Sequence, residues 1–155
     1  MKKFSCLVIA LAFLAFAGCK SNAPGGGAAS GPTKEAAVQT LRSFLAAVEA
    51  KDYDKAAAMI KLPPQLSQDD VKKGLGRILE LQEISAQGID ILADKGKWGK
   101  LAEVYGEDRA NHFAERAGVS VNDSYGLNYQ EAEAAFYWDG QQFKITRVNN
   151  IGKLK

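Results

Sequence analysis

The chain has 155 residues, with 20 basic and 18 acidic side chains, one histidine and two cysteines. This length fits a single domain. The near balance of charge removes the electrostatic case for a nucleic-acid-binding protein. A single histidine with only carboxylates near it in sequence makes a poor site for a transition metal.

The N-terminal segment has the form of a secretory signal. Lys2 and Lys3 give it a positive start, and an almost wholly apolar run follows from Phe4 to Ala17. A transmembrane helix needs roughly 20 apolar residues, so this shorter run is typical of the hydrophobic region of a signal peptide. Small residues then precede Cys19.

The stretch "LAFLAFAGCK" resembles the lipobox of bacterial lipoproteins, with Phe16 at the usual Leu position. The resemblance implies cleavage before Cys19, a diacylglycerol on its thiol and an acylated amino group. Two or more acyl chains anchor a protein stably, whereas one chain does so only marginally. Lys20, in place of the Asp that retains enteric lipoproteins in the inner membrane, implies the outer membrane. The alternative is an ordinary cleaved signal with an incidental Cys.

We therefore expect a lipid-anchored protein of the bacterial cell envelope, on the outer membrane and facing the periplasm. Residues 1–18 are the signal peptide and 19–33 are the lipidated Cys and a flexible tether. A Gly-rich tether of this length has a root-mean-square reach of roughly 20 Å. Without the signal peptide the acidic and basic residues are equal in number, and no free thiol remains for a disulfide or a metal. Residues 34–155 form a single globular domain.

Helices are predicted at the start of this domain. Val38, Leu41, Leu45 and Val48 recur at helical spacing, which predicts an amphipathic helix over about 34–50. A short second helix follows in "KDYDKAAAMI", and the proline pair 63–64 ends it.

A third helix is predicted from Ser67, which has capping-box spacing to Asp70. Its expected apolar residues are Val71, Leu75, Ile78 and Leu79. Gly74 and Gly76 are unfavourable inside a helix. They indicate either an irregular helix or a closely packed backbone, and we favour the close packing.

The middle of the domain, residues 86–130, allows more than one interpretation. The stretch "GIDILADKGKW" fits a strand after a C-cap at Gly88, or a helical segment that ends at Gly96. The stretch "GKLAEVYGEDRANHFAERAG" has helical apolar spacing, and Gly118 is a natural stop.

The C-terminal part predicts a β-hairpin. "EAEAAFYW" and "QQFKITRV" flank Asp139-Gly140, a strong two-residue turn signal. The expected cross-strand pairs are Trp138–Gln141, Phe136–Phe143, Ala134–Ile145 and Ala132–Arg147. One face then carries Trp138, Phe136, Phe143, Ala134 and Ile145, and the other carries Glu133, Tyr137, Lys144 and Thr146.

The phrases "FLAAVEAKDYDKAAAMI" and "FYWDGQQFKI" resemble the nuclear-transport-factor-2-like superfamily. The resemblance implies a cone-like α+β fold, in which N-terminal helices pack on a small antiparallel sheet that ends in a C-terminal β-hairpin. That superfamily includes isomerases, dehydratases and binding modules, so the fold does not give the function.

The main candidate site is a pocket built from Arg147, Trp138, Phe136 and Phe143. In the predicted register Arg147 shares the apolar face, where a buried guanidinium needs an anionic partner. It would then bind an anionic group bidentately. The alternative is that Arg147 lies at the rim of the sheet and reaches solvent.

Other candidates carry weaker signals. His112 has Asp108 and Glu115 at helical spacing, which fits a general base or local ion pairs on a solvated helix face. "DKGKWGK" surrounds Trp98 with lysines, and a loop folded back on the core is the favoured interpretation. Residues of an isomerase-like site would be sought among Asp52, Tyr53, Asp123, Tyr125 and Tyr129. We predict no catalytic, metal or cofactor residue.

The sequence thus favours a non-enzymatic binding or accessory module. It would be attached to the membrane through its lipid, with a small ligand or an envelope protein as partner and no nucleic acid. A hydrolase or isomerase with a cone-shaped pocket is the alternative. A structural accessory subunit without a pocket is a third possibility.

Overall fold

The computed structural model describes residues 31–155, so the predicted signal peptide, Cys19 and most of the tether lie outside the described residues. Within this part the helices and strands are α1 (Lys34–Glu49), α2 (Tyr53–Ala58), α3 (Gln68–Leu75), α4 (Ala86–Lys95), β1 (Lys97–Lys100), α5 (Leu101–Tyr105), α6 (Glu107–Ala117), β2 (Ser124–Tyr129), β3 (Ala132–Trp138) and β4 (Phe143–Asn149). A short 3₁₀ turn, η1 (Val121–Asp123), precedes β2, and a second, η2 (Ile151–Lys153), follows β4. None of the helices in the described range has the length and apolar character needed to cross a bilayer.

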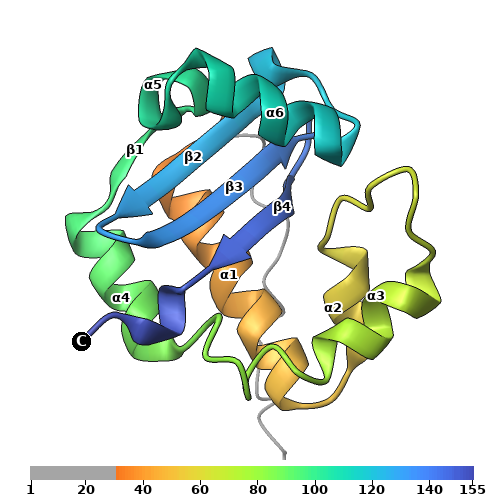
Figure 1. Cartoon of the computed structure of the whole chain (residues 1–155). Helices are drawn as coiled ribbons and strands as arrows, with labels where there is room; N and C mark the ends of the chain where they lie inside the picture. The colour runs from red at the N-terminus through yellow and green to blue at the C-terminus, as the bar shows by residue number, and fades with distance from the viewer. Residues whose placement is uncertain (1–30) are drawn as a thin grey trace, which may run out of the picture.

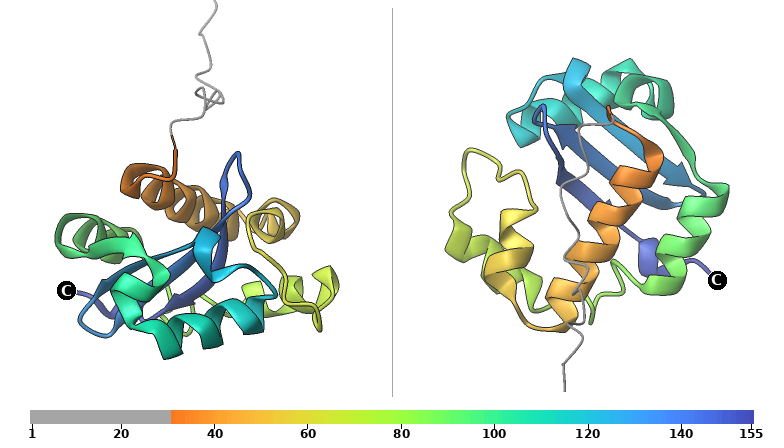
Figure 2. Two further views of the ribbon diagram at one scale, coloured as in Figure 1. Left: turned by 90° about the horizontal axis from the view of Figure 1, so that it is seen from above. Right: turned by 180° about the vertical axis from the view of Figure 1, so that it is seen from behind.

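The strands form one antiparallel sheet in the order β1-β2-β3-β4. Helices cover both faces: α1 and α4 lie on one, and α5 and α6 on the other (Figure 1, Figure 2). We call these the α1 face and the α6 face. Helices α2 and α3 lie beyond the outer edge of β4. The expected α+β class, with N-terminal helices against an antiparallel sheet and strands at the C-terminus, is confirmed.

The larger core lies between α1, α4 and the α1 face. It includes Leu41, Phe44, Leu92, Phe136 and Ile145, all almost inaccessible to solvent. Burial of each such side chain contributes about 1.5–3 kcal/mol. A smaller core lies under α5 and α6, so the sheet is held between two helical layers.

The first helices largely match their predicted signals. The Thr33 side chain accepts a hydrogen bond from the Ala36 amide at the start of α1, and Asp52 does the same for Lys55 before α2. Ser67 begins α3 with the expected capping box.

Helix α3 ends earlier than predicted. Leu75 is its last residue and Gly76 its C-cap, while Leu79 is 38% exposed. The expected close packing at the glycines is wrong, because a Cβ on Gly74 would meet nothing within 4 Å. The glycines instead mark the end of a short helix, since glycine is a poor helix former.

Of the two alternatives for the middle, the structure has the helical one. Ser85 caps α4 and Gly96 ends it. Gly88 lies inside α4, where a Cβ would sit 1.8 Å from the carbonyl oxygen of Ile151. It therefore permits close contact between α4 and η2 rather than ending the helix.

The next segment is helical as predicted, but Gly106 divides it into α5 and α6. Gly118 adopts the left-handed conformation that ends α6, with φ 64°. Strands β1 and β2 were not predicted. Trp98 lies in β1 rather than in a loop, and its ring packs against the core.

The hairpin is present, but its turn is longer than the predicted Asp-Gly pair. Trp138 pairs with Phe143, so residues 139–142 form the loop. Asp139 Oδ1 accepts hydrogen bonds from the amides of Gln141 and Gln142, at 2.9 and 2.8 Å. The predicted register is wrong because the carboxylate of Asp139 stabilises this wider turn.

Replacement of Asp139 tests this explanation. Asp139→Ala removes the acceptor of two amides and is expected to lower the free energy of unfolding by about 1 kcal/mol near neutral pH. Urea denaturation measures this loss. Asp139→Asn is the control, because it keeps an oxygen in the same place.

The loss should also depend on pH. Partial burial raises the pKa of Asp139, but hydrogen bonds from Gln142 and Gln141, together with Lys144, lower it more. A lowered pKa in the folded state means that the stabilisation is complete above the ordinary value, about 4, and disappears as the pH falls through the folded-state pKa. Equal stability of wild type and Asp139→Ala at pH 6 would contradict the explanation.

Candidate functional site

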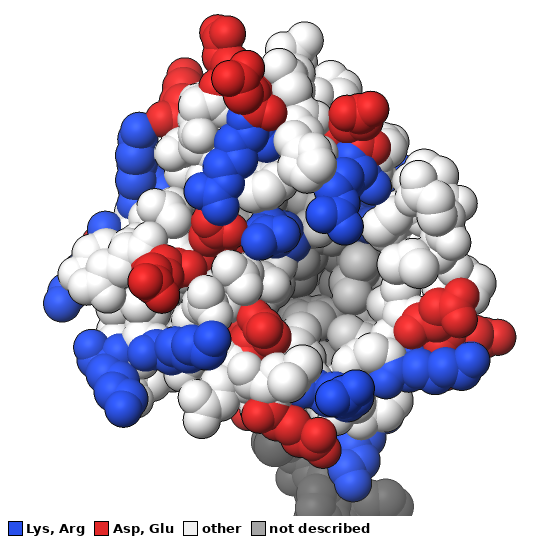
Figure 3. Space-filling view, in the orientation of Figure 1, with Lys and Arg blue, Asp and Glu red and all other residues white. Residues whose placement is uncertain are grey.

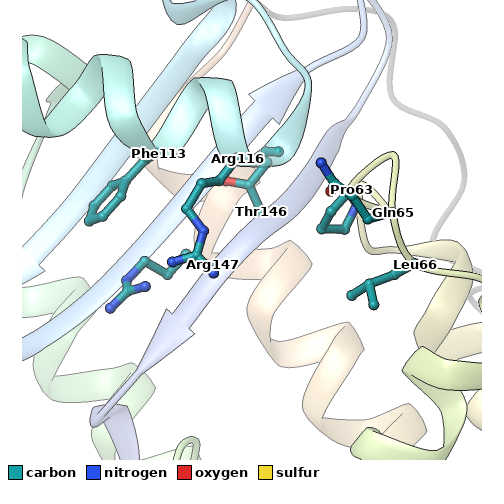
Figure 4. Close-up of a pocket in the computed structure, with 8 residues that line it drawn as sticks. Pro63, Gln65, Leu66, Phe113, Arg116, Thr146 and Arg147 are labelled. Atoms are coloured by element: carbon teal, nitrogen blue, oxygen red, sulfur yellow. The ribbon is translucent and has the colours of Figure 1, made fainter.

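An open groove lies beside β4 on the α6 face, with a volume of about 460 Å³. Figure 3 shows it as a hollow near the centre of the surface. Three separate segments line it: the α2–α3 loop, the C-terminal half of α6 and the middle of β4 (Figure 4). The lining residues are Pro63, Gln65, Leu66, Phe113, Arg116, Ala117, Thr146 and Arg147.

A β-bulge places Arg147 in this groove. Phe136 of β3 pairs with Ile145, but Ala135, the residue before Phe136, pairs with Arg147. The extra residue in β4 is Thr146, and both Thr146 and Arg147 line the groove. The predicted pairing of Arg147 with Ala132 is therefore wrong. A bulge places two residues opposite one and so changes which face the following side chains occupy.

Arg147 is paired with a buried carboxylate. Its Nε donates to Glu133 Oε2 at 2.9 Å, and Arg109 of α6 contacts the other oxygen, Oε1. The Glu133 side chain is 7% exposed, whereas those of Arg147 and Arg109 are 36% and 50% exposed. Removing a carboxylate from water costs several kcal/mol unless it is paired. Glu133 therefore holds α6 and β4 together.

The ring of Phe113 supports both arginines. The guanidinium carbon of Arg147 lies 4.8 Å from the ring centroid, and that of Arg109 lies 5.1 Å from it. A cation near an aromatic face gains about 0.5–2 kcal/mol, depending on how far it is desolvated. Phe113 thus orients Arg147 within the groove.

Tyr105 fastens α5 to the sheet behind this cluster. Its hydroxyl lies 3.1 Å from the carbonyl oxygens of both Leu127 and Ala134, and its one hydrogen can be donated to either of them. The ring packs over Gly126, where a Cβ would be 2.6 Å from it. Burial, and secondarily the charge of Glu133, raises the pKa of Tyr105. The phenol therefore stays protonated and is not available as a base.

Arg116 is the second cation of the groove. It is exposed and forms no ion pair within residues 31–155. Across the groove Leu66 is 47% exposed, so its apolar side chain is accessible to a ligand. The lining thus combines two positive charges, no negative charge and an apolar side. It suits an anion that carries an apolar body.

The other predicted pocket residues lie elsewhere. Phe136 and Phe143 are buried in the core of the α1 face, with ring centroids 5.6 Å apart. Trp138 is half-buried and lies 4.9 Å from Phe143, centroid to centroid. The structure brings these three aromatic residues together but separates them from Arg147, which lies on the opposite face.

The weaker candidates do not form a cluster. His112 is exposed on α6, and no described group of three His, Cys, Asp or Glu side chains could hold a metal ion. Asp52 caps α2, while Tyr125 stacks on Trp98 with 5.5 Å between the ring centroids. Asp123 ends η1.

Comparison with protein-family models, with curated proteins and with solved structures finds no match to this chain. The resemblances to bacterial lipoproteins and to the nuclear-transport-factor-2-like superfamily therefore stay predictions.

The sequence missed the role of Glu133, Arg109, Phe113, Arg116 and the 63–66 loop. One signal was present: Ala135 lies two residues after Glu133 in the strand segment "AEAA", so the two residues share one face of the sheet. A small residue on that face allows a helix to cover the strand, and a covered carboxylate needs cations. The identity of those cations depends on the tertiary fold.

Glu133→Gln tests the cluster. It leaves two arginines without their carboxylate and should lower the free energy of unfolding by about 1–3 kcal/mol. The 3–5 kcal/mol typical of fully buried pairs is not expected, because both arginines reach solvent. Thermal and urea denaturation measure the loss. The nearby exposed Glu131→Gln is the matched control, and equal stability of the two variants would show that the cluster contributes nothing.

Proposed function

We propose that this protein is a lipid-anchored binding module of the bacterial cell envelope, and that its groove binds an anionic ligand. The observation that carries the proposal is the composition of the groove: Arg116 and Arg147 line it with no acidic residue. The lipid anchor is inferred from the lipobox-like stretch before Cys19.

The two arginines play different parts. Glu133 bonds the Nε of Arg147, and the Nη atoms of Arg147 make no hydrogen bond within the described residues. They remain able to contact an anion, as does the whole guanidinium of Arg116. Arginine suits carboxylates, phosphates and sulfonates because its planar fork donates two parallel hydrogen bonds.

The rest of the lining supports binding over catalysis. Among the described residues that line the groove, the two arginines are the charged ones, and a guanidinium donates hydrogen bonds but has no acceptor. A hydrolase or isomerase needs a base or acid poised near neutral pH. Glu133 is held by two cations and Tyr105 has a raised pKa, so neither is suited to that role.

The start of α1, which the predicted tether precedes in sequence, lies where it is compatible with an accessible groove. The tether joins the domain at the start of α1, and α1 lies on the sheet face opposite α6 (Figure 2). A domain attached in this way can present its groove toward the periplasm.

Labelling with a radioactive fatty acid tests the anchor. Bacteria that express the wild-type chain should incorporate label into it, whereas Cys19→Ser should carry none. Cys6→Ser is the control and should label like wild type, because Cys6 lies within the predicted signal peptide. Equal labelling of Cys19→Ser and wild type would show that there is no lipid on this residue.

Binding of anilinonaphthalene sulfonate, a small apolar sulfonate, tests the groove. Arg116→Gln in the Cys19→Ser chain should weaken binding about five- to tenfold, equivalent to about 1–1.4 kcal/mol. The matched control is Arg42→Gln. It removes an exposed arginine of α1 that forms an ion pair with Asp90 of α4. Fluorescence titration gives the affinities. Equal affinities for the two variants would contradict an anion site at the groove.

A further inference from the structure

Strand β4 is one of the two edge strands of the sheet. Just past its end, the amides of Asn150 and Ile151 donate to Glu83 Oε2 and to Glu83 O, both at 3.0 Å. Within residues 31–155 the strand itself has one backbone bridge on its outer side. Ile60 forms a parallel bridge with Ile145. The Ile145 amide donates to Met59 O at 2.8 Å, and the Lys61 amide donates to Ile145 O at 2.9 Å. Pro63 follows shortly and has no amide hydrogen to donate. The chain's own pairing therefore stops where the groove begins.

Between this bridge and the contacts of Glu83, one residue of β4 keeps a free outer backbone side. Backbone groups of an antiparallel strand alternate between the two sides. The backbone amide and carbonyl of Ile145 form hydrogen bonds on the side away from β3. After the bulge, Arg147 pairs with Ala135 of β3. The amide and carbonyl of Val148 therefore point away from β3. Within residues 31–155 they make no backbone hydrogen bond outside the sheet.

This edge adjoins the basic groove. The bulge directs both Thr146 and Arg147 into the groove, next to Arg116 and across from the exposed Leu66. A hollow runs along β4 in the space-filling view (Figure 3). A free amide and carbonyl, two cations and an apolar side thus lie next to one another.

We infer that the ligand of the groove is an extended acidic segment of a partner protein, which forms a short β-bridge with the backbone of Val148 at the edge of β4. This inference rests on the proposed anion-binding function. Main-chain hydrogen bonds provide affinity in strand addition, and alternate side chains provide specificity. The charge of the groove selects carboxylates, which Arg116 and Arg147 bind. A small anion would satisfy the arginines but would leave the Val148 edge unpaired.

The test measures hydrogen exchange of the Val148 amide by NMR in the full Cys19→Ser chain. The probe is the blocked hexapeptide acetyl-Val-Glu-Val-Glu-Val-Glu-amide. Saturation with this peptide should slow exchange at Val148 at least tenfold, and Arg116→Gln should weaken its binding about fivefold. Anilinonaphthalene sulfonate should bind the groove without slowing that amide.

Two further peptides separate charge from strand pairing. The same hexapeptide with every amide nitrogen methylated keeps its carboxylates but cannot pair as a strand, so it should bind at least tenfold more weakly. A version with Lys in place of Glu should not bind. Equal binding of the methylated and unmethylated peptides would overturn strand addition.

The remaining outcomes also decide the matter. Slow exchange of the Val148 amide in the free chain would show that the edge is already occupied, and would overturn the inference. Binding of the sulfonate without binding of the acidic peptide would overturn it while leaving the anion groove intact. Failure of both probes to bind would reject the proposed function together with the inference.

Discussion

One extra residue in β4 determines how the two faces of this protein differ. Up to Ile145 the strand alternates regularly and places its apolar residues on the α1 face. Without the bulge, Arg147 would lie on that same face beside Ile145, where a guanidinium would have to be buried among aromatic and aliphatic side chains. With it, Thr146 and Arg147 both reach the α6 face, and Val148 returns to the core. The bulge thus keeps the core apolar and supplies the groove with a cation.

The α6 face is organised around the buried carboxylate that receives this cation. Ala135 and Gly126 have small side chains or none on this face of the sheet. Helices α5 and α6 can therefore approach closely and cover Glu133. Its two oxygens are then satisfied by Arg109 from α6 and Arg147 from β4. An ion pair of this kind adds little net stability relative to an apolar contact, but a missing partner is costly. The cluster therefore specifies how α6 sits on the sheet more than it strengthens the fold.

The sequence predicted the fold better than the site, for a physical reason. Periodicity and capping signals are local, and they located α1, α2 and the start of α3. The predicted hairpin loop is two residues shorter than the loop in the structure. A shift of two residues in the strand register keeps every side chain on its face of the sheet. Phe136, Phe143 and Ile145 therefore still pack together on the α1 face. The bulge adds one residue and reverses that face, which is why Arg147 alone was misplaced. Nothing in "FKITRV" marks the bulge, because it depends on how β4 fits β3.

The groove illustrates what an arginine gains from a buried partner. A free arginine side chain loses rotamer entropy when it binds, which offsets part of the interaction. Arg147 has already lost much of that freedom, since Glu133 holds its Nε and Phe113 supports its guanidinium plane. Its remaining nitrogens are therefore preorganised for an anion, whereas Arg116 keeps its mobility and adds charge. Because the second cation on Glu133, Arg109, offsets the charge of the carboxylate, the positive charge of Arg147 is not cancelled. The groove keeps a positive character although an acidic residue lies directly behind it.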